Sequence, residues 1–421
     1  MSIKLTYTDI NESCNRFAIY VRFHRVKEKL SLRDLAKMTG LSHTYLYKVE
    51  HNLIPLTKSP FEKITGYFNH RLSKNSSLDD LIESISVQFH EAIFYNKTDV
   101  IETMFNAIRP YENYYLNSLK IPEYLLILQG YSYMRNVVYD EKVTLYDDYL
   151  ETLIDRFNRH QEALFYLYRG LSRYKFFQHD KALSDLIKVI DAHGDQKRVA
   201  LASMIIGRIY SDKNLPYQAE AYLKKAKRVY EVSNHFETAL YIEVYIMINL
   251  LKEHRLEGLE KELKSLIEKT KKPAFETLNS LVNVHLMYLY IRLTQYEDAL
   301  LISHDVIHKT PQYYFYYVLA NYYQKNTSDY ANILKNLRKD SVHEEDQVYI
   351  MAIEALNCAN NSACEHHFAL FLKSYEEAYR TKKILDVLLL HPFIEEYYTN
   401  IRQYKQAYYL NRKLIEAIRG Q

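Results

Sequence analysis

A pattern of small and apolar residues occurs twice in the middle of this 421-residue chain, and it constrains the fold more than any other feature. The first copy consists of Gly170, Ala182 and Leu186, and the second copy consists of Gly207, Ala219 and Leu223. The spacing is the same in both copies. Small residues at fixed offsets allow two consecutive helices to cross closely. The pattern therefore predicts a stack of helix pairs.

The composition agrees with an all-α fold. The chain has only 8 glycines and 8 prolines, whereas all-β folds need turn residues at roughly every tenth position. From residue 78 onward almost every segment has helical periodicity, with Asn, Asp, Lys and Gly at the breaks. No stretch approaches the ~20 apolar residues that span a bilayer, and three cysteines cannot form a disulfide framework. We therefore expect an all-α, cytoplasmic protein without a membrane segment.

Charge is unevenly distributed along the chain. Residues 1–75 contain thirteen basic and six acidic residues, a net charge of +7, and the remainder carries −4. A small basic head on a mildly acidic body is typical of a nucleic-acid reader with a separate sensor. Chance together with a solvated helix face explains the charge equally well. The charge distribution alone therefore does not decide between this explanation and a nucleic-acid reader.

The head also contains a helix-turn-helix pattern. Residues 16–29 have helical periodicity. Ser31 is placed to cap a helix over 32–38, with Asp34 as its capping partner. Gly40 then supplies a tight turn, where a positive φ favours glycine. Ser42 is placed to cap a helix over 43–50. Glu50 is expected to be structural and to pair with Arg22 or Arg25.

This segment resembles the Xre/lambda-repressor type of helix-turn-helix domain over about residues 16–70. Leu35-Ala36, Gly40-Leu41-Ser42 and the run from Tyr45 to Glu50 carry the resemblance. Leu32 departs from it, because the family usually has a backbone-contacting Gln there. Asn52 also departs from it by replacing the usual Gly after the recognition helix, although Asn tolerates the left-handed conformation.

The resemblance implies that the start of the second helix enters the major groove. His43 and Thr44 are the expected base contacts, and Arg33 and Lys48 the expected phosphate contacts. The alternative for each residue is a solvated surface position. The predicted DNA-binding set is Arg33, Ser42, His43, Thr44, Tyr45 and Lys48.

The body is similar to tetratricopeptide repeats, with longer and less regular spacing. The resemblance implies six to nine helix pairs in a right-handed superhelix with a concave groove. A peptide backbone in that groove needs amide, hydroxyl and guanidinium partners. The predicted peptide-binding set is Arg208, Asn249, Asn283, Tyr288, Arg292, Asn321, Tyr323 and Gln324. Capping or surface amides and inter-repeat packing of tyrosines are the competing interpretations.

No sequence feature indicates an enzyme. A Walker loop, a Gly-x-Ser-x-Gly elbow and a Rossmann glycine pattern are all missing from the sequence. Cys358, Cys364, His366 and His367 lie close together, but their spacing fits no standard zinc site. We expect no catalytic residues, no cofactor and no metal.

A helix-turn-helix head followed by a degenerate tetratricopeptide body resembles the RRNPP family of peptide-pheromone receptors in Gram-positive bacteria and their phages. The resemblance implies a DNA-binding domain over 1–75, and a peptide-sensing and dimerisation domain over 76–421. It also implies a homodimeric transcriptional regulator that binds double-stranded DNA and is switched by a short signalling peptide. The last helix pair, about 384–419, is the expected dimer contact.

Two alternatives remain at this stage. The repeat body could act on a partner protein such as a response regulator, as some members of this family do, without any need for the basic head. The head could also be a scaffold that has lost its affinity for DNA. Neither alternative explains the +7 charge of the head as economically.

Overall fold

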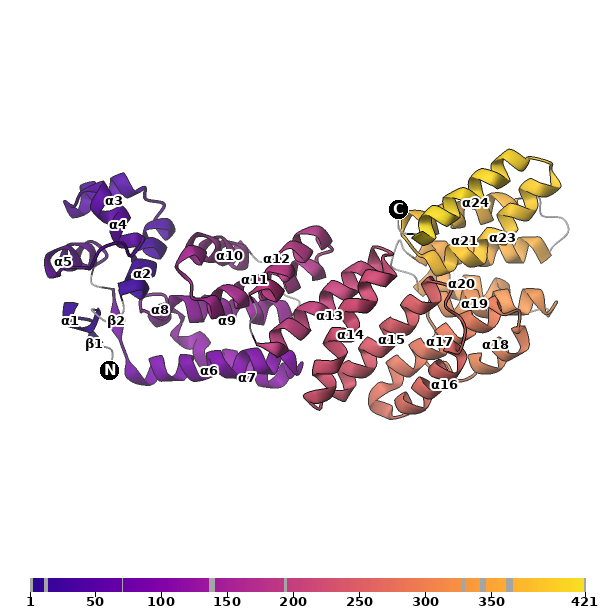
Figure 1. Ribbon diagram of the computed structural model, residues 1–421, viewed down its shortest axis with the longest axis horizontal. Coiled ribbons are helices and arrows are strands. Elements are labelled where there is room, and N and C mark those ends of the chain that lie inside the picture. Colours follow the sequence, from indigo (N-terminus) through magenta and orange to yellow (C-terminus); the bar gives the residue numbers. More distant parts are fainter. Residues whose placement is uncertain are drawn as a thin grey trace. The chain divides into compact units, whose positions relative to one another are not determined.

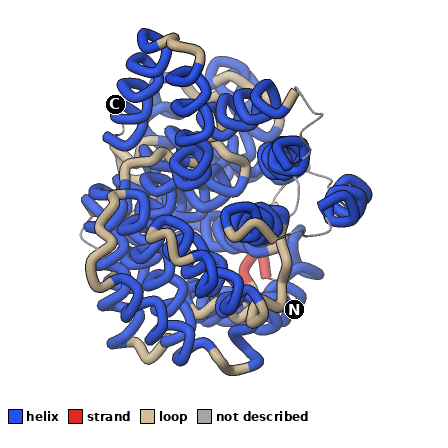
Figure 2. Tube along the Cα trace, turned by 90° about the vertical axis from the view of Figure 1, so that its right-hand side faces the viewer, coloured by secondary structure: helices blue, strands red, loops and turns tan. Residues whose placement is uncertain are grey.

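The computed structural model describes residues 3–10, 14–69, 71–135, 141–192, 195–326, 330–340, 346–360 and 366–419. These residues form two compact units, Met1–Ile205 (unit 1) and Ile206–Gln421 (unit 2). Helices make up nearly all of both units (Figures 1 and 2). Two short strands, β1 (Ile3–Lys4) and β2 (Ser73–Lys74), pair antiparallel, with Ile3 opposite Lys74. The predicted all-α class is confirmed.

The head contains the predicted helix, turn and helix. Its helices are α1 (Tyr7–Ile10), α2 (Cys14–Lys27), α3 (Leu32–Thr39), α4 (His43–Glu50) and α5 (Lys58–Tyr67). Ser31 Oγ accepts a hydrogen bond from the Asp34 backbone, and the Asp34 carboxylate accepts one from the Ser31 backbone. Gly40 ends α3 with φ 64°, and Ser42 caps α4 through Tyr45 N at 3.1 Å. Asn52 has the expected left-handed conformation, with φ 49°.

An unusual aromatic cluster fills the core of the head. His24 is fully buried, and its ring lies 4.4 Å from the ring of Tyr20, 5.2 Å from Phe23 and 5.4 Å from Phe68. Neither ring nitrogen has a well-formed hydrogen bond within the described part of the chain. Burial lowers the pKa of His24 to about 3, and nearby cations act in the same direction. His24 therefore packs as a neutral aromatic ring.

Replacing His24 with phenylalanine is expected to flatten the acid side of the stability profile. An unfolded chain protonates this histidine near pH 6.5, whereas the folded protein keeps it neutral down to about pH 3. The unfolded state therefore binds one more proton in that window, and stability falls as the pH drops. Between pH 7 and 5 the wild type should lose about 2 kcal/mol more than His24→Phe. Urea denaturation at both pH values measures this difference. His304→Asn is the control, because His304 is exposed, and it should behave as wild type does. An equal loss of stability between pH 7 and 5 in wild type and His24→Phe would contradict the prediction.

The rest of unit 1 is a series of helices on which the head rests. The elements are α6 (Ser76–Phe94), α7 (Thr98–Ile108), η1 (Arg109–Tyr111), α8 (Glu112–Tyr115), α9 (Ile121–Met134), α10 (Glu141–Leu153), η2 (Ile154–Arg156), α11 (Arg159–Lys175) and α12 (His179–Asp191). The first part of α13 (Gln196–Asp212) also belongs to this unit, because the boundary falls inside that helix.

Unit 2 continues the series of paired helices after α13. The elements are α14 (Pro216–Val232), α15 (Phe236–Lys252), α16 (Leu259–Thr270), η3 (Pro273–Phe275), α17 (Glu276–Arg292), α18 (Tyr296–Ser303), α19 (Pro311–Tyr323), α20 (Tyr330–Asp340), α21 (Gln347–Asn360), α22 (His367–Arg380), α23 (Ile384–Asn400) and α24 (Tyr404–Arg419). Among the described residues no helix is long and apolar enough to cross a membrane.

The glycines of the repeated pattern lie where paired helices cross. A Cβ atom at Gly170 on α11 would lie 2.7 Å from Leu186 Cγ on α12. A Cβ atom at Gly207 on α13 would lie 2.6 Å from Leu223 Cγ on α14. The leucine of each pattern therefore occupies the space that a side chain on the glycine would need. This is the close crossing that the spacing predicts, and the helix-pair repeat is confirmed.

Non-glycine residues make most of the left-handed turns between helices, which is why the chain needs so few glycines. Leu215 N, for example, donates to Tyr210 O at 2.8 Å across such a turn. Residues of this kind with positive φ are Asn96, Phe177, Asn214, Asn234, His254, Thr294, Lys325, Lys382 and Arg402. Asparagine, the most frequent of them, adopts this conformation more easily than other side chains do.

Candidate DNA interface and candidate ligand pocket

The start of α4 is an exposed polar edge of the head. Ser42, His43, Thr44 and Lys48 are exposed, as is Arg33 on the neighbouring α3, and Tyr45 is half-buried. The structure therefore places the predicted DNA-binding residues on α3, on α4 and at the cap of α4, all of them with some exposed surface. Whether they contact DNA stays a prediction. Short polar side chains flanked by cations have the chemistry that base edges and phosphates require.

The other end of α4 is fixed inside the head by an ion-pair cluster. Glu50 is 1% exposed, and its carboxylate accepts from Arg25 Nε at 2.6 Å and Arg25 Nη2 at 2.9 Å. Arg22 Nε lies 3.7 Å from the same carboxylate. The predicted pairing of Glu50 is confirmed. Arg22 and Arg25 are therefore structural. The exposed cations of the predicted DNA-binding set are Arg33 and Lys48.

The head is also fastened to the end of α10 and to η2. Arg22 donates to Thr152 O at 3.0 Å and pairs with Asp155, while Arg156 Nη1 donates to His51 O at 2.5 Å. His51 directly follows α4, so η2 contacts the end of α4. The domain boundary predicted at residue 75 falls inside unit 1 and stays a prediction.

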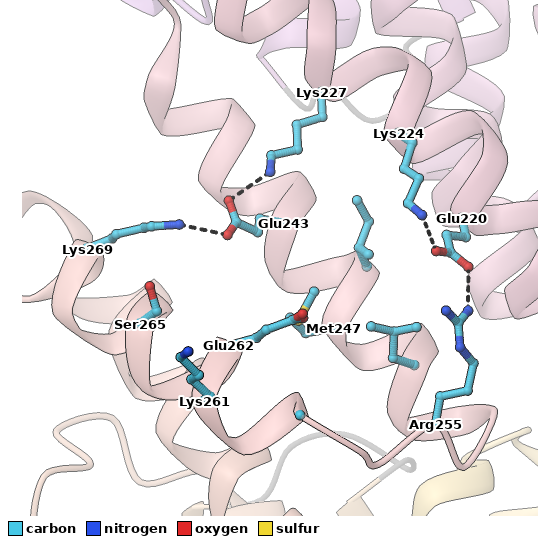
Figure 3. Close-up of a pocket in the computed structure, with 13 residues that line it drawn as sticks. Glu220, Lys224, Lys227, Glu243, Met247, Arg255, Lys261, Glu262, Ser265 and Lys269 are labelled. Atoms are coloured by element: carbon cyan, nitrogen blue, oxygen red, sulfur yellow. Dashed lines mark hydrogen bonds and ion pairs between the residues drawn. The ribbon is translucent and has the colours of Figure 1, made fainter.

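Unit 2 contains a pocket of about 760 Å³ formed by α14, α15 and α16 (Figure 3). Its apolar floor comes from Ile246, Met247 and Leu250 of α15. The charged lining residues are Glu220, Lys224, Lys227, Glu243, Arg255, Lys261, Glu262 and Lys269. Five of these are basic and three acidic, so the lining has an excess of positive charge. Figure 3 shows their side chains around the central space.

Two carboxylates hold the walls of this pocket together. Glu220 accepts from Lys224 at 2.6 Å and from Arg255 at 3.0 Å. Glu243 lies 3.0 Å from Lys227 Nζ on α14 and 2.9 Å from Lys269 Nζ on α16. Burial alone would raise the pKa of Glu243, but the two lysines hold it below its ordinary value. An anion with an apolar part suits this combination of charge and floor.

The predicted peptide-binding residues do not line this pocket. Asn249, Asn283, Tyr288 and Asn321 are buried. Asn249 Oδ1 accepts from Ser211 Oγ at 2.9 Å, so that amide takes part in the packing of α13 against α15. In this structure these four residues pack between helices, as the competing interpretation expects. Their contact with peptide stays a prediction that would require the helices to move.

The other four predicted residues keep exposed surface. Arg208 lies 5.0 Å from the centre of the Tyr245 ring, and Arg292 Nη2 lies 3.4 Å from His254 Nδ1. Tyr323 is 37% exposed and stacks on Tyr296 at 4.7 Å, and Gln324 ends the same helix half-buried. The peptide role of these residues also stays a prediction.

The zinc alternative gains no support. Cys364 lies outside the described residues. Within the described ranges no group of three His, Cys, Asp or Glu side chains is arranged to hold a metal ion.

Sequence comparison identifies no relative: no protein-family model matches the chain, and no curated protein matches it either. Solved structures do match. The apo form of the quorum sensor NprR from B. thuringiensis has a TM-score of 0.65 at 11% identity, covering 80% of this chain and 98% of that one. A Rap protein complexed with competence and sporulation factor has a TM-score of 0.59 at 14% identity, covering 80% and 97%.

Aspartyl phosphate phosphatase F from Bacillus subtilis is also similar, with a TM-score of 0.52 at 16% identity, covering 83% of this chain and 96% of that one. Identities this low establish the fold and leave the activity open. The fold expected from the RRNPP resemblance is thus confirmed, and this chain has the helical-repeat fold of NprR, of the Rap protein and of phosphatase F.

Proposed function

We propose that this protein is a peptide-responsive transcriptional regulator of the RRNPP type. The head binds double-stranded DNA, and the repeat body binds a short signalling peptide that changes the DNA affinity. The observation that carries the proposal is the two-sided construction of α4. Its first turn presents polar side chains to solvent, its last residue, Glu50, is bound by Arg25, and the next residue, His51, accepts from Arg156 of η2.

The exposed turn suits the major groove. In helix-turn-helix domains the N-terminal residues of the second helix reach the base edges, and the preceding helix crosses the phosphate backbone. His43 and Thr44 would read bases, while Arg33 and Lys48 would bind phosphates on either side. The net charge of +7 on residues 1–75 supplies the long-range attraction to DNA.

Contacts between the head and η2 offer a route for switching. Arg156 and Arg22 tie the end of α4 to helices of the body within unit 1. A peptide that favours one arrangement of the repeats would therefore shift the population of head positions. In a homodimer this changes the distance between two recognition helices, and DNA half-sites are spaced by helical turns. The exposed Tyr404, Tyr408 and Ile415 on α24 are the proposed dimer contact.

The peptide proposal is supported by what the similar structures hold. NprR has been crystallised with its cognate peptide NprX, and a Rap protein with competence and sporulation factor. In this chain the pocket of α14–α16 offers an apolar floor and excess positive charge. We propose that it receives a peptide carboxylate together with a neighbouring apolar side chain.

Similarity to phosphatase F supports a second candidate function. In that case the repeat body would act on a partner protein, and the head would not need to bind DNA. The two candidates differ in one measurable property, because only the first requires the exposed turn of α4.

Mobility shift with DNA from the neighbourhood of this gene tests the first candidate. Replacing His43, Thr44 and Lys48 together with alanine should weaken specific binding by about 100-fold or more, because each good base contact contributes roughly 1–3 kcal/mol. The matched control is the double substitution Lys58→Ala and Lys63→Ala. It removes two exposed positive charges that lie on α5 rather than on α4, so it should weaken specific DNA binding far less.

A second arm adds synthetic peptides encoded by small reading frames beside the gene. A peptide that strengthens or abolishes specific DNA binding would support the switch. Weak, salt-labile binding that ignores both the triple substitution and every peptide would contradict it, and would favour the partner-protein function.

A further inference from the structure

Three helices of unit 1 meet at a polar cluster in which Arg198 and His90 are buried. At the start of α13, Lys197 pairs with Glu91 in the last turn of α6. The next residue, Arg198, donates from Nη1 to His160 O in the first turn of α11 at 3.4 Å. His90, beside Glu91, is close enough for the charge of Arg198 to affect its pKa. These contacts place Arg198, His90 and the start of α11 together.

Arg198 is buried without a counter-charge. It is 7% exposed, and within the described ranges no carboxylate lies at ion-pair distance from its guanidinium. Its Nε has no hydrogen-bond partner. Glu91 is already paired with Lys197, and Asp195 is exposed and accepts from the Lys197 backbone at 2.7 Å. A buried cation left in this state is strongly unfavourable.

His90 is a second buried side chain that lacks hydrogen-bond partners among the described residues. It is 5% exposed, and neither ring nitrogen has a partner among the described residues. Burial lowers its pKa to about 4, Arg198 pushes it further in that direction, and Asp195 acts in the opposite direction. Burial and Arg198 also lower the pKa of His160. His90 is therefore neutral near pH 7, with one N–H that needs an acceptor.

We propose that Arg198, His90 and the N-terminal turn of α11 enclose a binding site for a small oxyanion, a phosphate group or a carboxylate. Two oxygens of the anion would accept from Arg198 Nε and Nη2 in the bidentate arrangement that guanidinium favours. A third contact would come from the His90 N–H. The 17-residue helix α11 begins here and adds its positive end, whereas the start of α13 is already capped by the Asp195 carboxylate.

An ordered water satisfies this site only in part. Water can accept from His90 and from Arg198 Nε, but it brings no negative charge to the buried guanidinium. An anion would supply both the negative charge that the Arg198 guanidinium lacks and an acceptor for the His90 N–H. The site is independent of the proposed function, because it involves neither α4 nor the pocket of α14–α16.

The test uses the full-length chain in a phosphate-free chloride buffer. Sodium phosphate, sulfate and acetate are titrated separately at constant ionic strength, and thermal unfolding is followed by circular dichroism and binding by calorimetry. We expect the Tm to rise with a saturable dependence on one of the oxyanions, with one site per chain. The comparison of phosphate with acetate identifies which oxyanion the site takes.

Arg198→Met should abolish the saturable rise, and in chloride alone it should leave the Tm unchanged or higher, because it removes an unpaired buried charge. Arg109→Met is the matched control, since Arg109 is an exposed arginine at the start of η1 in the same unit and outside the site, and it should respond to the anion as wild type does. If Arg198→Met does not fold, His90→Phe provides the same comparison. The proposal is overturned if wild type shows no saturable response to any oxyanion, or if Arg198→Met keeps the response; ordered water would then fill the site.

Discussion

Replacing Glu50 with alanine is expected to lower the free energy of unfolding of unit 1 by about 3–5 kcal/mol and to remove DNA binding. Glu50 is 1% exposed and binds Arg25 through two hydrogen bonds, with Arg22 close to the same carboxylate. Removing one partner of a buried ion pair leaves the other charge uncompensated. Because Glu50 ends α4, the loss also loosens the helix that carries His43 and Thr44.

Urea denaturation followed by far-UV circular dichroism measures this effect, since the chain has no tryptophan. Glu62→Ala is the matched control: Glu62 is an exposed glutamate of the same head and makes one long contact, 3.9 Å, to Lys58. It should change stability by less than about 0.5 kcal/mol. Arg25→Met in the Glu50→Ala background should recover part of the loss by removing the uncompensated charge. Equal effects of Glu50→Ala and Glu62→Ala would contradict the prediction.

Features that depend on neighbours in the sequence were predictable. Ser31 and Asp34 cap α3 through bonds that span three residues, and Gly40 adopts the one conformation that favours glycine. The Gly170–Leu186 contact joins consecutive helices, so a fixed spacing was enough to predict it. In each case the physical cause lies within about twenty residues of chain.

Features that depend on distant residues were not predictable. Arg22 pairs with Asp155 from 133 residues away, and no local pattern announces that partner. Asn249 is buried, and its Oδ1 accepts from Ser211 Oγ on another helix, a bond that no local pattern announces. An inner-face asparagine is equally compatible with a peptide contact and with such a bond.

The pocket of α14–α16 was missed for a related reason. Its lysines and glutamates resemble solvated helix faces in the sequence, and only the packing of α14 and α16 against α15 brings Lys227 and Lys269 to the Glu243 carboxylate. A periodic row of cations on two helices, each facing an acid, is the signal that could have indicated it.

The second large effect is expected at Gly207, where alanine should destabilise unit 2. A Cβ atom there would lie 2.6 Å from Leu223 Cγ, 2.8 Å from Leu223 Cδ2 and 3.1 Å from Ala219 O. Leu223 Cγ is bonded to Cβ and can move only by a change of χ1, which the packing around this buried side chain opposes. The carbonyl cannot move without the helix, so α13 and α14 must separate. Overpacking of this kind costs about 1–3 kcal/mol, against the ~1 kcal/mol that alanine gains over glycine in a helix. The net loss should therefore lie between about zero and 2 kcal/mol, and Gly207→Val should lose more.

A double-mutant cycle with Leu223→Ala isolates the cause of that loss. Leu223 is fully buried, so Leu223→Ala alone should cost roughly 2–5 kcal/mol. In the Gly207→Ala background it should cost less, by about 1–3 kcal/mol, because the truncated side chain no longer meets the new methyl group. Lys225→Ala on the exposed face of α14 is the control and should change stability by less than about 0.5 kcal/mol. Additive effects of Gly207→Ala and Leu223→Ala would show that the glycine is not required by this crossing, and the physical basis of the repeat pattern would have to lie elsewhere.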